Sequence, residues 1–121
     1  MPQPRFVHLR LHSEYSVTDG TVRLDAGKNH DCPPVSRAIA DGMPALALTD
    51  LSNLFGMVKF YTAARSHGIK PILGCDVFIA NAADLDRPYR LLLLCRSHRG
   101  YLQLCELLSR SQLAPRVRGR A

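Results

Sequence analysis

The chain has 121 residues, of which 46% are apolar and 21% charged, a composition that allows one modest globular domain and excludes wholesale disorder. No apolar run approaches the roughly 20 residues of a membrane-spanning helix, and residues 1–10 lack the basic flank and apolar centre of a secretory signal. We therefore expect a cytoplasmic protein without a membrane partner.

The net charge of +6 is concentrated at the end of the chain. Residues 1–109 hold 12 of the 16 Lys and Arg and all ten acids, whereas the remainder carries four arginines and no acid. Such a tail either contacts nucleic-acid phosphates or is solvated and unstructured. We expect a folded domain over residues 1–110 and a basic, disordered tail over residues 111–121.

The cysteines show no spacing typical of a zinc knuckle or a redox pair. They stand at Cys32, Cys75, Cys95 and Cys105. The last three have apolar neighbours, among which a free thiol behaves as a small hydrophobe. We expect reduced, structural cysteines.

The first half of the chain predicts two strands separated by a helix. Residues 6–11 alternate in polarity and are followed by a turn at 18–20, which indicates a strand and its loop. Prolines at the start and Gly42 at the end favour a helix over residues 33–41. Residues 45–49 form a short apolar run typical of a strand buried on both faces.

The second half predicts a helix, two strands and a final helix. Asn53 is expected to cap a helix that ends at His67 and Gly68. Strands are predicted over 70–80 and 89–95, and a helix over 98–109. The inward residues are expected to be Leu54, Val58 and Tyr61 in the first of these helices and Leu102, Cys105 and Leu108 in the second. The order β-α-β-α-β-β-α predicts an α/β fold with a mainly parallel sheet. A complete eight-stranded barrel takes about 250 residues, so this is part of a barrel, truncated before closure.

Three polar side chains follow or end the predicted strands. His12 comes after the first strand, Asp50 after the second and Asp76 near the end of the third. The period of two also places His8 and Arg10 on the same side of the first strand as His12. Imidazoles and carboxylates that converge at one edge are metal-ligand types. The alternative is a set of hydrogen-bonded structural groups.

Residues 6–20, 42–61, 68–76 and 99–109 resemble, in this order, the amino-terminal PHP domain (polymerase and histidinol phosphatase) of bacterial DNA polymerase III alpha subunits. The resemblance implies a distorted β/α barrel that in some members binds a metal cluster and removes 3′-terminal nucleotides. We interpret the chain as an amino-terminal fragment of such a replicative DNA polymerase, a nucleotidyltransferase.

The resemblance also implies a degenerate metal site. Metal-competent members carry His-x-His after the first strand, Thr-Asp-His after the second and Glu near the end of the third. Here Arg10 and Leu51 replace two of the imidazoles, so the positions His8, His12, Asp50 and Asp76 are expected to be vestigial and without metal. We expect no cofactor in this fragment and no catalytic residue, with Mg²⁺ serving the full polymerase.

The leading hypothesis is a structural and interaction module within the alpha subunit. Its expected partners are the rest of that subunit, a proofreading exonuclease subunit, and DNA through the full-length protein. The alternative is a metal-dependent phosphoesterase or 3′-exonuclease that holds Mn²⁺ or Zn²⁺ with the reduced ligand set. A third reading, a free-standing basic nucleic-acid-binding protein, lacks aromatic residues interleaved with the basic tail.

Arg10 is expected to pair with Asp50 or Asp76 as an internal substitute for the metal. Two carboxylates gathered without a cation would destabilise each other, and a guanidinium supplies a permanent positive charge and directed hydrogen bonds. The alternative is a solvated arginine on an edge strand.

Overall fold

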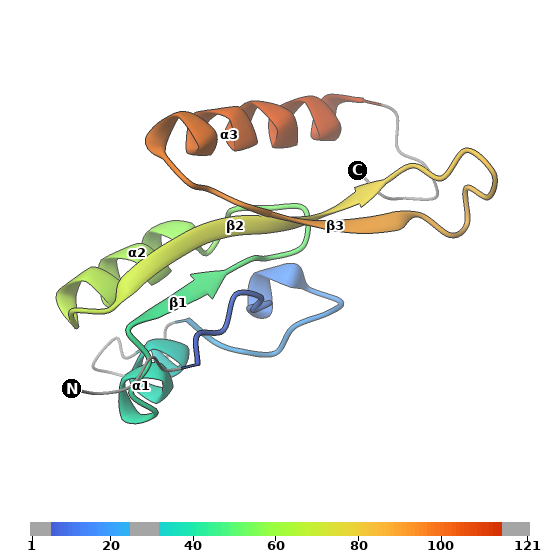
Figure 1. The fold of residues 1–121 in the computed structure, drawn as a ribbon. Helices are drawn as coiled ribbons and strands as arrows, with labels where there is room; N and C mark the ends of the chain where they lie inside the picture. The colour runs from blue at the N-terminus through green and yellow to red at the C-terminus, as the bar shows by residue number, and fades with distance from the viewer. Residues whose placement is uncertain (1–5, 25–31, 115–121) are drawn as a thin grey trace.

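The computed structural model describes residues 6–24 and 32–114 and has an α/β architecture (Figure 1). Its elements are η1 (Glu14–Ser16), α1 (Pro33–Ala40), β1 (Ala45–Leu48), α2 (Met57–Ser66), β2 (Lys70–Ile79), β3 (Tyr89–Leu94) and α3 (His98–Leu113). Within this part of the chain, no helix has the length and hydropathy needed to cross a membrane.

The sheet has the strand order β1-β2-β3. β1 runs parallel to β2, as expected when a helix connects two strands, whereas β2 and β3 are antiparallel. The expectation of a mainly parallel sheet is therefore wrong for the second pair. The reason is the connection over residues 80–88, which contains no helix and returns the chain directly beside β2.

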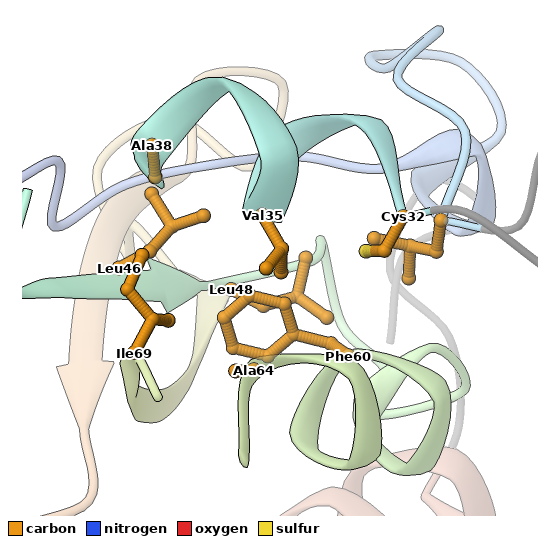
Figure 2. Close-up of a cluster of buried hydrophobic side chains, with 9 residues drawn as sticks. Cys32, Val35, Ala38, Leu46, Leu48, Phe60, Ala64 and Ile69 are labelled. Atoms are coloured by element: carbon orange, nitrogen blue, oxygen red, sulfur yellow. The ribbon is translucent and has the colours of Figure 1, made fainter. Parts of the chain in front are cut away.

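The main hydrophobic core lies around β1, whose four residues are all buried. Figure 2 shows Val35 of α1, Leu48 of β1 and Phe60 of α2 pointing toward one another. α3 packs separately, with Leu104 and Leu108 against Cys75 of β2. Figure 1 shows α1 and α3 far apart, α1 next to β1 and α3 above β2 and β3, and the middle of β2 is buried.

Residues 6–11 do not form the predicted first strand. The segment still runs beside β1, because Ala47 N donates to His8 O at 3.0 Å and Thr49 N donates to Leu11 O at 2.9 Å. Leu11 N, however, donates to the hydroxyl of Thr49 at 3.0 Å instead of to a backbone carbonyl. The Thr49 hydroxyl thus takes the place of one backbone acceptor. Residues 6–11 keep their predicted position beside β1 but do not form a regular strand.

Asn53 does not cap α2, which begins four residues later at Met57. Its Nδ2 donates to Tyr15 O at 2.8 Å and to Leu51 O at 3.0 Å, while its Oδ1 accepts from Phe55 N at 3.1 Å. Asn53 thus shapes the loop before the helix by an Asx-type turn.

The inward faces of the two long helices differ from the predicted ones. α2 buries Phe60 and Ala64, while Val58 is 67% exposed and Tyr61 44% exposed. α3 buries Leu104 and Leu108, so only Leu108 of its predicted inward residues is buried, and Leu102 is 54% exposed. Each buried pair has the i, i+4 spacing of one helix face, and the tertiary contacts with the sheet decide which face turns inward.

α3 continues to Leu113, past the predicted domain boundary at residue 110. The first residues of the predicted basic tail are therefore helical, and Arg110 pairs with Glu106 at 2.7 Å. Residues 115–121 of that tail lie outside the described residues.

All four cysteines are free thiols, as predicted. Cys75 is fully buried, and this burial raises the pKa of its thiol from an ordinary 9.0 to about 11. The thiol is consequently protonated in the folded protein over the whole physiological range.

Truncation of Phe60 tests the core. Phe60→Ala is expected to lower the free energy of unfolding by about 3–5 kcal/mol, because the side chain is fully buried between α1, β1 and α2. Val58→Ala, two residues away on the exposed face of the same helix, is expected to change it by less than about 0.5 kcal/mol. Urea denaturation followed by circular dichroism measures both; similar losses in the two variants would contradict the assignment of the inward face.

Cys75 gives a pH prediction. Because its pKa is higher in the folded than in the unfolded chain, the thiol contributes stability below about pH 9 that is lost as the pH rises toward 11. The free energy of unfolding of the native chain is expected to decline more steeply over this interval than that of Cys75→Ala. Parallel pH profiles for the two proteins would show that the Cys75 thiol does not have this shifted pKa.

Candidate functional site

Two buried carboxylates lie side by side where β1 ends against β2. Asp50 is 2% exposed and Asp76 is fully buried. Asp76 N donates to Asp50 O at 3.0 Å, Ser52 N donates to Asp76 O at 2.8 Å, and Leu51 forms a parallel bridge with Asp76. The parallel register of β1 and β2 thus brings together two predicted site residues that are 26 positions apart in sequence.

Asp76 forms an ion pair with Arg10, as predicted. Arg10 Nε donates to Asp76 Oδ2 at 2.8 Å, and this bond raises the pKa of the guanidinium above its ordinary value. The Arg10 side chain is 51% exposed, so it reaches from the surface to a carboxylate that has no solvent contact. His12 Nε2 contacts the same Oδ2, so one oxygen of Asp76 takes both partners.

His12 extends this ion pair into a longer chain of polar contacts. Its Nδ1 lies 3.1 Å from Asp19 Oδ2, and the same oxygen of Asp19 accepts from Arg90 Nη1 at 3.2 Å. Both ring nitrogens of His12 therefore face carboxylate oxygens. We call the chain of Arg10, Asp76, His12, Asp19 and Arg90 the charge network.

The sequence did not point to Asp19 and Arg90. Asp19 stands in the predicted turn at 18–20, where aspartate is common for local reasons. Arg90 lies on β3 opposite Phe78, and only the antiparallel register of β2 and β3 carries it toward Asp19. The spacing of residues in the sequence does not predict this register of β2 and β3.

Asp50 is stabilised by neutral donors and makes no ion pair with Arg10. It accepts hydrogen bonds from Ser13 N at 2.6 Å, from Ser13 Oγ at 2.8 and 2.9 Å, and from Ser16 Oγ at 2.9 Å. Ser13 caps η1, and Ser16 Oγ also accepts from Leu51 N at 3.0 Å. Both serines are buried and were missed by the sequence reasoning, since isolated serines near a turn are ordinary.

The loop that carries these serines and His12 closes on itself. Ser13 forms a bridge with Val22, and Glu14 N donates to Val22 O at 2.7 Å. A Cβ atom at Gly20 would stand 2.2 Å from Ser13 O, so only glycine permits this closure. The closure positions His12 between Asp19 and Asp76.

His8 lies apart from the other predicted positions. Its ring is exposed and meets the ring of Phe6 edge-on, with the centroids 4.5 Å apart. The structure therefore brings together Arg10, His12, Asp50 and Asp76, and leaves His8 outside the charge network.

The donors present do not fit a divalent metal cluster. Arg10 holds a permanent positive charge against Asp76 Oδ2, both oxygens of Asp50 accept from protein donors, and the Leu51 side chain has no donor atom. Asp76 Oδ1 is buried without a hydrogen-bond partner in the described part of the chain. One free oxygen is too few, and no group of three or more His, Cys, Asp or Glu in residues 6–24 and 32–114 is arranged to hold an ion.

Comparison with known sequences gives consistent relatives. The profile of the PHP domain matches residues 8–120. DNA polymerase III subunit alpha of Xylella fastidiosa (strain 9a5c) is 45% identical over 120 residues, which is 93% of this chain and 10% of that protein. The corresponding subunit of Neisseria meningitidis serogroup A is 47% identical over 90% of this chain and 9% of its own length, and that of Escherichia coli K12 is 44% identical over 92% and 9%. The chain thus spans about a tenth of the length of these relatives.

Solved structures share the fold at low sequence identity. An amidohydrolase from Chromobacterium violaceum matches with a TM-score of 0.55 and 20% identity, over 88% of this chain and 36% of its own. A Bifidobacterium adolescentis protein described as a metal-dependent phosphoesterase matches with a TM-score of 0.51 and 18% identity, over 89% and 32%. These likenesses support the partial barrel architecture.

A double-mutant cycle tests the Arg10–Asp76 pair. Arg10→Met is expected to lower the free energy of unfolding by more than the roughly 1 kcal/mol ceiling of an exposed ion pair, because the buried carboxylate loses a donor. Adding Asp76→Asn is expected to restore part of that loss. Urea denaturation of the four proteins gives the coupling energy.

Arg37→Met is the matched control for this cycle. Arg37 pairs with Asp41 at 3.0 Å on the surface of α1, where its side chain is 80% exposed, so its loss is expected to cost less than about 1 kcal/mol. Effects of Arg10→Met and Asp76→Asn that add to within about 0.5 kcal/mol would refute the coupling.

Proposed function

This chain belongs to the PHP domain family, and we propose that it is the amino-terminal PHP segment of a replicative DNA polymerase alpha subunit, in which it acts as a structural and interaction module. The observation that carries the proposal is the Arg10–Asp76 ion pair, which stands at the position where metal-competent members of the family gather ligands. The identity of 44–47% to alpha subunits over about nine-tenths of the chain supports the same parentage.

The charge network supports a structural role. A guanidinium stays charged at every physiological pH, so the compensation of Asp76 needs no ion from solution. The network also connects four parts of the chain: the segment before η1, the turn after η1 that carries Asp19, the middle of β2, and β3. In this proposal the former metal site holds the fold together and performs no hydrolysis.

Polymerisation belongs, in this proposal, to other parts of the longer subunit. Nucleotide transfer requires carboxylates that hold catalytic Mg²⁺ with open coordination positions. Asp50 and Asp76 are buried and engaged with protein donors, so we do not assign them to that reaction.

The proposed partners are the rest of the alpha subunit and a proofreading exonuclease subunit, with DNA reached through the full-length protein in the cytoplasm. An exposed strand edge supports a covering partner. β3 pairs with β2 on one side only within the described sheet, and Tyr89, Leu91 and Leu94 on it are 40–61% exposed. Unpaired apolar edges are normally covered by another chain segment.

Metal binding and hydrolysis test the proposal at the natural length of the protein. We expect no tight binding of Mn²⁺ or Zn²⁺ by calorimetry and no chelator-sensitive release of 3′-terminal nucleotides. Arg10→His combined with Leu51→His is expected to raise Mn²⁺ affinity by tenfold or more, because it removes the competing cation and adds two imidazoles. Arg37→His is the control for an added surface imidazole.

Primer extension with Mg²⁺ by the same preparation reports the polymerase activity of the longer protein.

The outcomes separate the two functions. Tight metal binding by the native protein together with 3′-nucleotide release that a chelator abolishes would establish the alternative, a phosphoesterase or 3′-exonuclease with the reduced ligand set His8, His12, Asp50 and Asp76. Absence of primer extension would reject the assignment to a polymerase subunit.

A further inference from the structure

A pocket with a partly basic lining lies at the beginning of β2, away from the charge network. It is a pocket of about 450 Å³ between α2, the beginning of β2 and the turn from β3 into α3, elements seen together at the left of Figure 1. Lys70 at this end and Asp76 are six residues apart on one strand, a separation of about 20 Å. The pocket is therefore distinct from the site described above, and its volume lies in the range of small-molecule sites.

The wall of this pocket is positively charged. Lys70, Arg96 and His98 line it, and no acidic residue does. Among the described residues, none of the ion pairs involves these three side chains, whereas most other arginines of the folded part have carboxylate partners. The two cations Lys70 and Arg96, with no acidic residue in the lining, give a local field that attracts anions, and the His98 imidazole adds a ring nitrogen for hydrogen bonding.

The remainder of the pocket is apolar and aromatic. Leu73 lines its floor, and Tyr61 of α2 and Tyr101 of α3 line it from two different helices. Tyr61 is 44% exposed, and the Tyr101 ring lies 6.1 Å from the His98 ring, centroid to centroid. An exposed tyrosine ring and a half-buried one in the same pocket as two cations are suited to a ligand that has both a flat ring system and a negative charge.

We propose that this pocket binds a nucleoside phosphate. Lys70, Arg96 and His98 contact the phosphate oxygens, where Arg96 supplies a planar pair of donors and Lys70 a point charge. The base stacks on Tyr61 or Tyr101 over the apolar floor, an interaction that tolerates any base because each has a π-face. The same chemistry is offered by a free nucleotide and by the phosphorylated end of a single strand.

Photolabelling locates the ligand directly on the protein at its natural length. The probe is 8-azido-deoxyadenosine triphosphate, and the labelled peptides are identified by mass spectrometry. We expect saturable labelling of peptides that contain Tyr61 or Tyr101, reduced tenfold or more by Lys70→Gln combined with Arg96→Gln. Arg65→Gln, an exposed cation of α2 that does not line the pocket, is expected to leave the labelling unchanged. Circular dichroism confirms that each variant is folded.

Competition defines the ligand and its source. Deoxyadenosine triphosphate is expected to protect the pocket peptides at least tenfold better than inorganic tripolyphosphate, and Tyr101→Leu is expected to remove this difference. Stronger protection by a 5′-phosphorylated oligothymidylate than by the free nucleotide supports a strand end as the natural ligand; the reverse order supports a free nucleotide. No label in these peptides while other sites are labelled, or equal protection by tripolyphosphate, overturns the proposal. Primer extension in the same preparation keeps this result separate from the proposed polymerase parentage.

Discussion

A carboxylate in the middle of a buried strand must be neutralised or hydrogen-bonded, and the position of Asp76 in β2 imposes this requirement on the rest of the structure. The donors come from Arg10, 66 positions earlier in sequence, and from His12. Removing one partner would leave a buried charge short of compensation, which is among the costlier defects in a folded protein. The segment before η1 is therefore held beside the sheet although it forms no regular strand.

The same requirement is met in a different way at Asp50. Its neighbours are the hydroxyls of Ser13 and Ser16 and one backbone amide, which stabilise the charge by directed hydrogen bonds without an opposite charge. The two carboxylates are adjacent through the backbone, and their partners follow each other in sequence: Asp76 contacts Arg10 and His12, and Asp50 contacts the serines that come next. The absence of a side chain at Gly20 allows the loop after these residues to return to Ser13.

This division of partners shows how two adjacent buried carboxylates are compensated by groups of the chain itself. A divalent ion would neutralise both carboxylates at once and would require several open ligand positions. Here a guanidinium on one carboxylate and hydroxyls on the other supply comparable compensation from within the chain. The pocket near Lys70 lies at the beginning of β2, about 20 Å from Asp76, so the ligand proposed there would not contact the charge network.

Local pattern in the sequence determined the elements whose signal is short-range. The buried run at β1, the proline-started α1, the strands β2 and β3, and the four free cysteines all followed from neighbouring residues. The positions Asp50 and Asp76 also followed, since residues after parallel strands share one edge of a sheet. The resemblance of residues 6–20 and 42–61 to the PHP domain agreed with the profile match over residues 8–120.

Only the tertiary structure decided the features that depend on how the strands pair and on which of several possible partners forms a given hydrogen bond. The Thr49 hydroxyl accepts the hydrogen bond from Leu11 N that a backbone carbonyl would accept in a regular sheet, and residues 6–11 do not form a strand. Asn53 donates to Tyr15 O and does not cap α2. Packing against the sheet selected Phe60 over Val58 as the inward face of α2. Arg10 pairs with Asp76 and not with Asp50, and Arg90 pairs with Asp19. Both pairs join residues that are far apart in sequence and that only the tertiary arrangement brings together, so no local pattern in the sequence predicts them.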